Sequence, residues 1–258
     1  MTRRRITGAS IKAPSSKSSP GPTPRRPSPA STAPTGPNPY AAPRLDAQGN
    51  IYGTTDRGGV NNQGTVYKID ANSGALSTLV SFNGANGAYP IGALTVDARG
   101  NIFGTTLDGG ANNLGTVFEI AAGTTSLSTL ISFNGSNGAS PYGAPTLDAK
   151  GNLYGTTFGV GFDDQGTAFE IAAGTGAFST LVSFHGTNLA NPFGTITLDA
   201  LGNLYGTTGN GGANQYGAIF ELVNNAAVVP EPASLVIVGQ ATLVGLGLMI
   251  RARSRHGR

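Results

Sequence analysis

The side chains best suited to bind a cation in this sequence are the adjacent carboxylates Asp163 and Asp164. They follow a glycine-rich stretch and stand where related segments of the chain have Asn-Asn. Carboxylate oxygens in a polar loop are the ligands that Ca²⁺ prefers, so the pair is a weak candidate for a metal site. Gly159 and Gly161 in the same stretch do not predict a phosphate cradle, because no helical pattern follows them.

The two histidines offer little for acid-base chemistry. His185 stands where Asn83 and Asn134 stand in the related segments, which favours a turn residue over a general base. His256 lies in the C-terminal tail, away from any predicted core. The sequence therefore predicts no catalytic residue.

Four aspartates recur with the same neighbours, and one role explains all of them. Each begins the pattern Asp-Ala-x-Gly-Asn; they are Asp46, Asp97, Asp148 and Asp199. An aspartate at the start of a tight turn accepts hydrogen bonds from its own backbone, and the glycine can take a positive φ. Calcium at these turns would need further oxygen ligands, which the alanine does not supply. We expect structural turns here, with no metal and no cofactor.

These residues belong to a tandem repeat with a period of 51 residues. The segment LDAQGNIYGTT, which begins at Leu45, returns with the same skeleton from Val96, Leu147 and Leu198. An unbroken period of this length indicates one supersecondary unit that has been copied in tandem.

Each unit divides into four predicted strands joined by turn residues. In the second unit they are Gly92–Asp97, Ile102–Thr106, Gly115–Ile120 and Leu127–Phe133. Four short strands in about 50 residues are typical of a propeller blade. A parallel β-helix is the main alternative, but its coils are shorter, and the tight turn after the first strand implies antiparallel neighbours.

A pair of threonines recurs in every unit and could suggest a flat ice-binding array. The pairs begin at Thr54, Thr105, Thr156 and Thr207. Blades that are set radially would not place these threonines in one plane, which argues against ice binding.

The array resembles the bacterial tandem-repeat family known as GloVer repeats. The shared core is Gly-Asn-Leu-Tyr-Gly-Thr-Thr, found here from Gly49, Gly100, Gly151 and Gly202, followed by Gly-Thr-Val-Phe-Glu, which is intact at Gly115–Glu119. The resemblance covers about 180 residues and is specific because it recurs. It implies a propeller-like exported protein whose biochemical role is not established.

The sequence predicts three parts. Residues 1–44 are rich in Pro, Ser and Thr and predict a disordered head. Residues 45–229 predict an all-β, propeller-like array of four blades, the last one incomplete, because only Ala226–Val229 remain for its fourth strand. Residues 230–258 predict a separate C-terminal tail. The charged start Met1–Arg5 is not followed by an apolar region, so no N-terminal signal peptide is recognised.

Charge is unevenly distributed along the chain. Between Leu45 and Val229 there are four Lys and Arg against twelve Asp and Glu, which gives a net charge of 4 − 12 = −8, although the whole chain carries +3. Most of the basic residues therefore lie outside the repeats, which argues against nucleic acid as a partner. Cysteine is absent, which excludes disulfides and thiol chemistry.

The tail combines a short motif, an apolar stretch and a basic end. Residues 233–250 give about 27 Å of helix at about 1.5 Å per residue, barely enough to cross a bilayer. The predicted membrane anchor contains Leu235, Ile237, Leu243, Leu246, Leu248 and Ile250, and the basic stop contains Arg251, Arg253 and Arg255. Arginines directly after the span would hold that end in the cytoplasm. An amphipathic or buried helix is less consistent, because no polar face recurs at helical spacing.

With Pro230, Glu231 and Pro232 before it, this tail resembles the PEP-CTERM sorting signal of Gram-negative bacteria. The resemblance implies a protein held in the inner membrane by its C-terminal helix, processed near Pro-Glu-Pro by an exosortase, and passed to the cell surface or the extracellular matrix. The three residues of the motif would be the recognition residues.

We therefore expect a non-enzymatic, surface-directed repeat protein whose blade loops, such as Gly109–Gly115, bind polysaccharide or a surface protein. The alternative is a propeller-based hydrolase or lyase acting on extracellular polysaccharide. That activity would need a cluster of charged side chains near the axis, and Arg57, Lys68, Arg99 and Lys150 look too few and too scattered along the chain. A third possibility is a degenerate gene product that is never exported.

Overall fold

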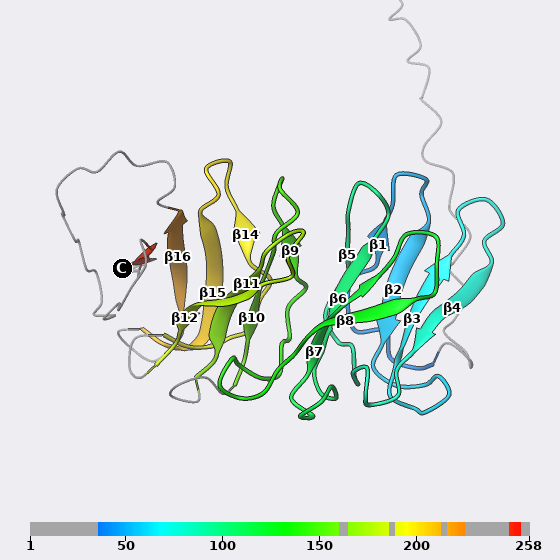
Figure 1. The fold of residues 1–258 in the computed structure, drawn as a ribbon, viewed down its shortest axis with the longest axis horizontal. Helices are drawn as coiled ribbons and strands as arrows, with labels where there is room; N and C mark the ends of the chain where they lie inside the picture. Colours follow the sequence, from blue (N-terminus) through cyan, green and yellow to red (C-terminus); the bar gives the residue numbers. More distant parts are fainter. Residues whose placement is uncertain (1–35, 160–164, 186–188, 213–215, 225–247, 254–258) are drawn as a thin grey trace, which may run out of the picture.

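A computed structural model of the chain describes residues 36–159, 165–185, 189–212, 216–224 and 248–253. These residues form four antiparallel sheets in a row, with the first and the fourth at opposite ends (Figure 1). Within the described ranges there is no helix. The all-β, propeller-like prediction is confirmed, and the antiparallel ladders exclude a parallel β-helix.

The first three sheets, which we call blades 1 to 3, have four strands in the order of the sequence. Blade 1 contains β1 (Arg44–Leu45), β2 (Ile51–Thr55), β3 (Thr65–Ile69) and β4 (Leu76–Ser81). Blade 2 contains β5 (Thr95–Val96), β6 (Ile102–Thr106), β7 (Thr116–Ile120) and β8 (Leu127–Ser132). Blade 3 contains β9 (Thr146–Leu147), β10 (Leu153–Thr157), β11 (Thr167–Ile171) and β12 (Phe178–Ser183).

Blade 4 departs from this plan at both edges. It contains β13 (Leu189–Pro192), β14 (Thr197–Leu198), β15 (Leu204–Gly211), β16 (Ala218–Asn224) and β17 (Leu248–Arg253). β13 and β14 both pair with β15, and β17 pairs with β16 along six residues from Asn224 to Ile219. A strand edge without a partner leaves backbone groups unpaired, and β17 satisfies that edge in blade 4.

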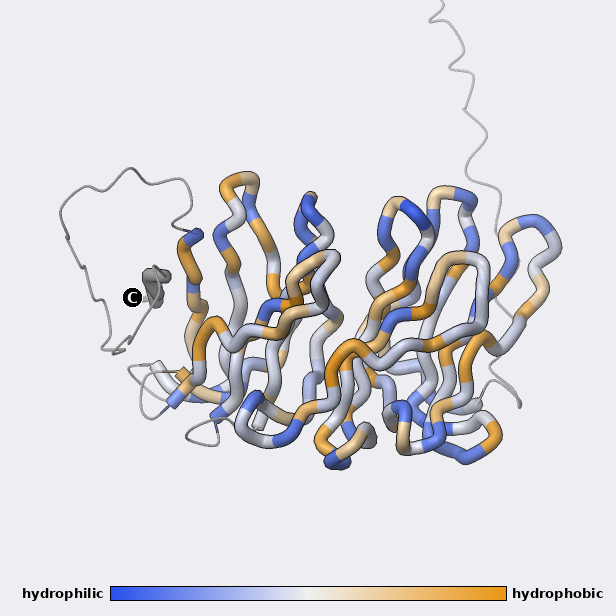
Figure 2. Tube along the Cα trace, in the orientation of Figure 1, coloured by the Kyte–Doolittle hydropathy of each residue, from blue (hydrophilic) through white to orange (hydrophobic). Residues whose placement is uncertain are grey.

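The core lies between neighbouring blades. Each outer strand is followed by a buried phenylalanine whose ring contacts a phenylalanine of the next blade; the pairs are Phe82–Phe118, Phe133–Phe169 and Phe184–Phe220. Their ring centroids are 5.0 to 5.4 Å apart, a favourable separation for aromatic contact. Apolar residues follow the strands and polar residues gather in the turns (Figure 2). Stacking of blade on blade is therefore what buries the apolar surface.

Glycine in the second strand of each blade makes room for these rings. A Cβ added at Gly155 would lie 2.5 Å from Cζ of Phe169, on the neighbouring strand. The other blades are alike. A Cβ added at Gly53, Gly104 or Gly206 would clash with the ring of Tyr67, Phe118 or Phe220, respectively. The glycine of the repeated Gly-Thr-Thr is thus required, because the aromatic ring of the third strand packs against it.

The first blade begins upstream of Leu45. Gly36 packs against Gly58, and the Asp56 amide donates to the Asn38 carbonyl at 3.3 Å, as Leu107 does to Tyr89 in blade 2. Asn38 and Tyr89 both have φ near +55°, so they occupy the same left-handed position. Residues 36–43, predicted as part of a disordered head, are therefore the blade 1 equivalent of the connectors that precede blades 2 and 3, and Arg44 already belongs to β1.

Most of the predicted tail lies outside the described residues, including Pro230–Pro232, Leu235, Ile237, Leu243, Leu246 and Arg255. The last part, with Leu248, Ile250, Arg251 and Arg253, is β17. No helix in the described ranges has the length and apolarity to cross a membrane. The segment Ala226–Val229, predicted as the fourth strand of the last unit, also lies outside the described residues.

Candidate functional site

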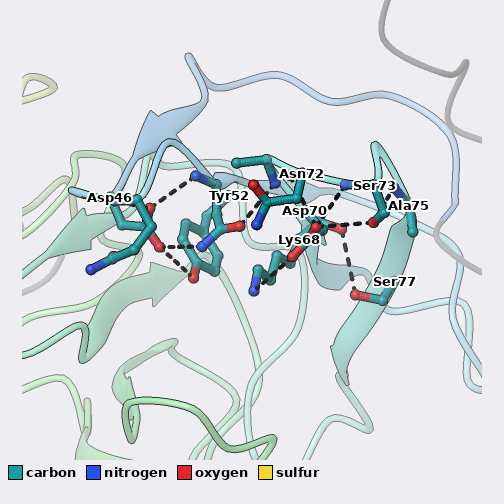
Figure 3. Close-up of polar contacts among 11 residues, drawn as sticks. Asp46, Tyr52, Lys68, Asp70, Asn72, Ser73, Ala75 and Ser77 are labelled. Atoms are coloured by element: carbon teal, nitrogen blue, oxygen red, sulfur yellow. Dashed lines mark hydrogen bonds and ion pairs between the residues drawn. The ribbon is translucent and has the colours of Figure 1, made fainter.

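The turn between the first two strands of each blade is held by its aspartate, as predicted. In blade 1, Oδ1 of Asp46 accepts from the amides of Gln48 and Asn50 at 3.0 and 2.9 Å. Its Oδ2 accepts from Nδ2 of Asn50 at 2.7 Å and from the Tyr52 hydroxyl at 2.9 Å (Figure 3). Gly49 has φ +83°, the left-handed conformation that the turn requires.

These contacts change the protonation equilibria of the turn. Burial raises the pKa of Asp46, but the hydrogen bonds from Asn50 and Tyr52 outweigh burial and leave that pKa below its ordinary value. Burial, together with the Asp46 carboxylate, raises the pKa of Tyr52 to about 12. The aspartate is therefore a carboxylate engaged in the turn and is not available as a general acid.

In blades 3 and 4 the tyrosine also reaches a glutamate on the third strand. The Tyr154 hydroxyl lies 3.2 Å from Oε1 of Glu170, and the Tyr205 hydroxyl lies 3.0 Å from Oε1 of Glu221. Each hydroxyl thus lies within hydrogen-bond distance of the turn aspartate and of the glutamate. This arrangement fixes the glutamate side chain over the blade face.

Blade 2 breaks this pattern, because Phe103 stands in the tyrosine position. Asp97 keeps its contacts with Arg99 and Asn101 but has no hydroxyl to accept from. Glu119 pairs with Phe103 across the sheet. Its side-chain carboxylate accepts no hydrogen bond within the part of the chain that the structure describes. The substitution leaves one carboxylate free at a half-buried position.

The free carboxylate lines a groove between blades 2 and 3, which we call the blade 2–3 groove. Its volume is about 1150 Å³. The charged residues in its lining are Arg44, Asp97, Arg99, Glu119, Asp148 and Lys150. The rest of the lining combines threonines, namely Thr95, Thr146 and Thr195, with apolar residues, among them Phe103, Leu130, Leu147, Leu153 and Ile171. Three positive and three negative side chains give a lining with no net charge, and an apolar floor with a few polar groups is typical of a ligand site.

The other predicted site residues do not come together. Asp163 and Asp164 lie outside the described residues. His185 is exposed, beyond the end of β12. Over the described ranges, no group of three or more His, Asp or Glu side chains is placed to hold a metal ion.

The threonine pairs of blades 1 to 3 have a structural role. The first threonine donates to a backbone carbonyl of the next connector, as Thr105 does to Gly143 at 3.0 Å. The hydroxyl of the second threonine forms a hydrogen bond with a threonine hydroxyl of the third strand; Oγ1 of Thr106 and Oγ1 of Thr116 are 2.8 Å apart. Both hydroxyls of blade 2 are thus engaged inside the protein, which removes them from any surface array.

The polar loop Gly109–Gly115, predicted to bind ligand, uses its asparagines internally. Oδ1 of Asn113 accepts from the Gly109 amide at 3.1 Å, and Nδ2 of Asn112 donates to the Phe133 carbonyl at 3.0 Å. The loop lies at the opposite end of the blade from the aspartate turn, since it joins the other ends of β6 and β7. The blade 2–3 groove is consequently a better site than this loop.

A family model, the Gloeobacter/Verrucomicrobia repeat, matches residues 36–231 of the chain. The chain belongs to this family. The match begins at Gly36, where the structure also places the connector that precedes blade 1. None of the curated proteins compared with this repeat protein matches it.

Several solved structures are similar to this repeat protein in fold. The extracellular domain of BT4673 from B. thetaiotaomicron matches with TM-score 0.50 and 12% identity, over 74% of this chain and 22% of that chain. TolB from Acinetobacter baumannii matches with TM-score 0.47 and 18% identity, over 74% and 41% of the two chains. A nidogen/laminin complex matches with TM-score 0.48 and 17% identity, over 68% and 56%. The chain spans just over half, or less, of the length of these structures.

The groove was missed in the sequence because its residues come from three repeats. Arg44, Arg99 and Lys150 look scattered along the chain, yet all three line the same groove. One signal was available: Phe103 is the single phenylalanine at a position where the other repeats of this family member have tyrosine. Where one repeat lacks a hydrogen-bond donor that the other repeats have, the acceptor in that repeat is left without its structural partner.

Proposed function

We propose that this repeat protein is a non-catalytic binding module that contacts a neutral polysaccharide through the blade 2–3 groove, at the cell surface or in the extracellular matrix. The observation that carries the proposal is the free carboxylate of Glu119 in a groove of about 1150 Å³. A carboxylate accepts up to two sugar hydroxyls, and the guanidinium and ammonium groups of the lining donate to others.

The charge of the lining favours a neutral ligand. Arg44, Arg99 and Lys150 are balanced by three carboxylates, so the groove has no net field to concentrate a polyanion or a polycation. The half-buried side chain of Leu130 offers an apolar surface for the carbon face of a sugar ring, with the buried Phe103 beneath it. A hydroxyl-rich, uncharged polymer meets both conditions.

The same contacts favour binding over hydrolysis. Glycoside hydrolysis requires two carboxyl groups with separate roles. Asp97 and Asp148 each accept two backbone amides and one asparagine amide in their turns, which leaves Glu119 as the single free carboxylate of the groove. A glycoside hydrolase would have to recruit its second carboxyl group from one already engaged in a turn.

The route to the exterior rests on the tail. Its three-part resemblance to a PEP-CTERM signal supports insertion in the inner membrane and processing by an exosortase-like enzyme at Pro230–Pro232. A reporter carrying residues 230–258 tests this in an exosortase-containing bacterium. We expect surface delivery, and retention in the inner membrane when Glu231 is replaced by Ala. A reporter that stays in the cytosol, or is delivered regardless of Glu231, would contradict the proposed route.

Glycan arrays test the binding role. We expect the full chain to bind one class of neutral polysaccharide, and Glu119→Gln to weaken that binding by about tenfold, which is about 1.4 kcal/mol. Glu221→Gln is the matched control, because it changes the same repeat position in blade 4, outside the groove. Blank arrays, or equal effects of the two substitutions, would count against the groove as the site.

A further inference from the structure

Both end faces of the array lack the cover that the internal blade faces receive. Each of the first three blades has one apolar residue that is completely buried against the following blade. These residues are Val66, Val117 and Ala168, in blades 1, 2 and 3. The equivalent residue of blade 4, Ile219, is 51% exposed. The face of blade 4 that would meet a following blade therefore carries a large apolar side chain in water, within the part of the chain that the structure describes.

Two threonines on the same face have lost their acceptors. The hydroxyls of Thr95 and Thr146 donate to the carbonyls of Pro145 and Ile196 in the next connector, but the Thr197 side chain is exposed and its hydroxyl makes no hydrogen bond to the described residues. Likewise, Thr54, Thr105 and Thr156 donate to connector glycines and are at most 4% exposed. Thr207 is exposed and makes no such bond to the described residues.

The opposite face of blade 1 is uncovered in the same way. Leu45 is 56% exposed, whereas its equivalents Val96, Leu147 and Leu198 are half-buried. Ile69 is only half-buried, whereas Ile120, Ile171 and Leu222 are at most 3% exposed. Blade 1 thus presents the surface that a preceding blade covers elsewhere in the array.

From this we infer that two copies of the chain associate head to tail, with blade 4 of one copy packed on blade 1 of the other. The repeat makes the occupant specific, because the three internal interfaces show which positions meet. By equivalence, Thr197 donates to the Pro43 carbonyl of the second copy, and Thr207 donates to its Ala41 carbonyl. Ile219 packs against the face of blade 1 in the second copy, as Val66 and Val117 pack against the following blade inside one chain.

This interface joins two different surfaces, the end face of blade 4 and the end face of blade 1. One such contact leaves blade 1 of the first copy and blade 4 of the second copy uncovered. Association of this kind either forms a ring or continues as a filament. Two copies with four blades each give eight blades, the upper end of the usual range for a closed propeller. We therefore expect a closed dimer in which both pairs of end faces are covered.

The first test measures mass in solution by light scattering on the full chain. We expect twice the 26.0 kDa of one chain, and a shift to monomer for Ile219→Asp and for Leu45→Asp. Leu201→Asp is the matched control, because Leu201 is 71% exposed in a turn and lies on neither end face; it should remain dimeric. A monomer at every concentration, or a dimer that both end-face variants preserve, would overturn the inference.

The second test fixes the polarity of the contact. The chain has no cysteine, so one cysteine can be placed in each of two samples. Thr197→Cys mixed with Pro43→Cys should crosslink through a short thiol reagent, whereas each variant alone should not. Crosslinking of Thr197→Cys with itself would show like faces in contact and would reject head-to-tail packing. Correct folding of each variant is checked by its far-ultraviolet circular dichroism.

Discussion

At the scale of the residue, hydrogen bonds from Asn50 and Tyr52 leave the pKa of the turn aspartate Asp46 below its ordinary value. The folded protein keeps Tyr52 neutral, since its pKa rises from 10.0 to about 12. A group whose pKa is raised by folding stabilises the protein below the unfolded pKa, and this contribution disappears as the pH rises through the folded value. Tyr154 is shifted in the same direction.

We therefore predict that thermal stability falls between about pH 10 and about pH 12 as these tyrosines ionise. Tyr52→Phe with Tyr154→Phe should lose less stability across that range, because neither ring can then ionise. The substitution fits the fold, since Phe103 occupies the same position in blade 2. Melting temperatures of both proteins at several pH values check this, and equal losses would contradict it.

Glycine at the centre of each second strand gives a second prediction at this scale. Gly155→Ala should reduce the free energy of unfolding by about 1–3 kcal/mol, because its Cβ would lie 2.5 Å from the buried Phe169 ring. Gly159→Ala is the control in the same blade. No atom of the described residues lies within 4 Å of a Cβ added there, so the cost should stay within about 0.5 kcal/mol. Denaturant titrations measure both, and similar costs would reject this role for the glycine.

At the scale of the element, threonine hydroxyls tie each blade to the next connector. Thr105 is 2% exposed and donates to the Gly143 carbonyl at 3.0 Å. Thr105→Val should reduce the free energy of unfolding by about 1–3 kcal/mol, because the buried carbonyl loses its donor. Thr129→Val makes the same change on the exposed outer strand β8 and should be nearly neutral. Chemical denaturation distinguishes the two outcomes, and a neutral Thr105→Val would contradict this role.

The strands were largely predictable from the sequence because their cause is local. Ile102–Thr106 was predicted with the bounds observed, since β-branched residues are flanked by Gly-Asn before and by a glycine loop after. The inner strand was predicted too long, because only Thr95–Val96 of Gly92–Asp97 pairs in a ladder. Residues 36–43 were assigned to the head because prolines hide their likeness to the other connectors, which is visible only once Asn38 and Tyr89 share a backbone position.

The groove could not be predicted in the same way, because it depends on how blades pack. The spacing of Arg44, Arg99 and Lys150 gives no local signal that they meet, and the depth of the groove is set by side chains from two sheets. Turn aspartates were predictable, since their partners lie two to six residues away. Contacts of short range follow from the sequence, and contacts between repeats do not.

At the scale of the whole molecule, stability should be greatest in the middle of the array. A repeat protein is stabilised by interfaces between neighbours, and blades 2 and 3 each have two of them. All five residues of β6 are buried, whereas β15 has exposed residues along its length. In the monomeric Ile219→Asp variant, we expect amide exchange to be slowest in β6, β7, β10 and β11. Uniform exchange over all four blades would contradict this.

The central claim is that the array binds an extracellular polysaccharide and does not cleave it. The most direct measurement incubates the full chain with the polysaccharide selected on the arrays and follows both retention of the protein and the chain length of the polymer. We predict retention that Glu119→Gln weakens and Glu221→Gln does not, with polymer length unchanged. Shortened polymer, or retention indifferent to Glu119, would contradict the account.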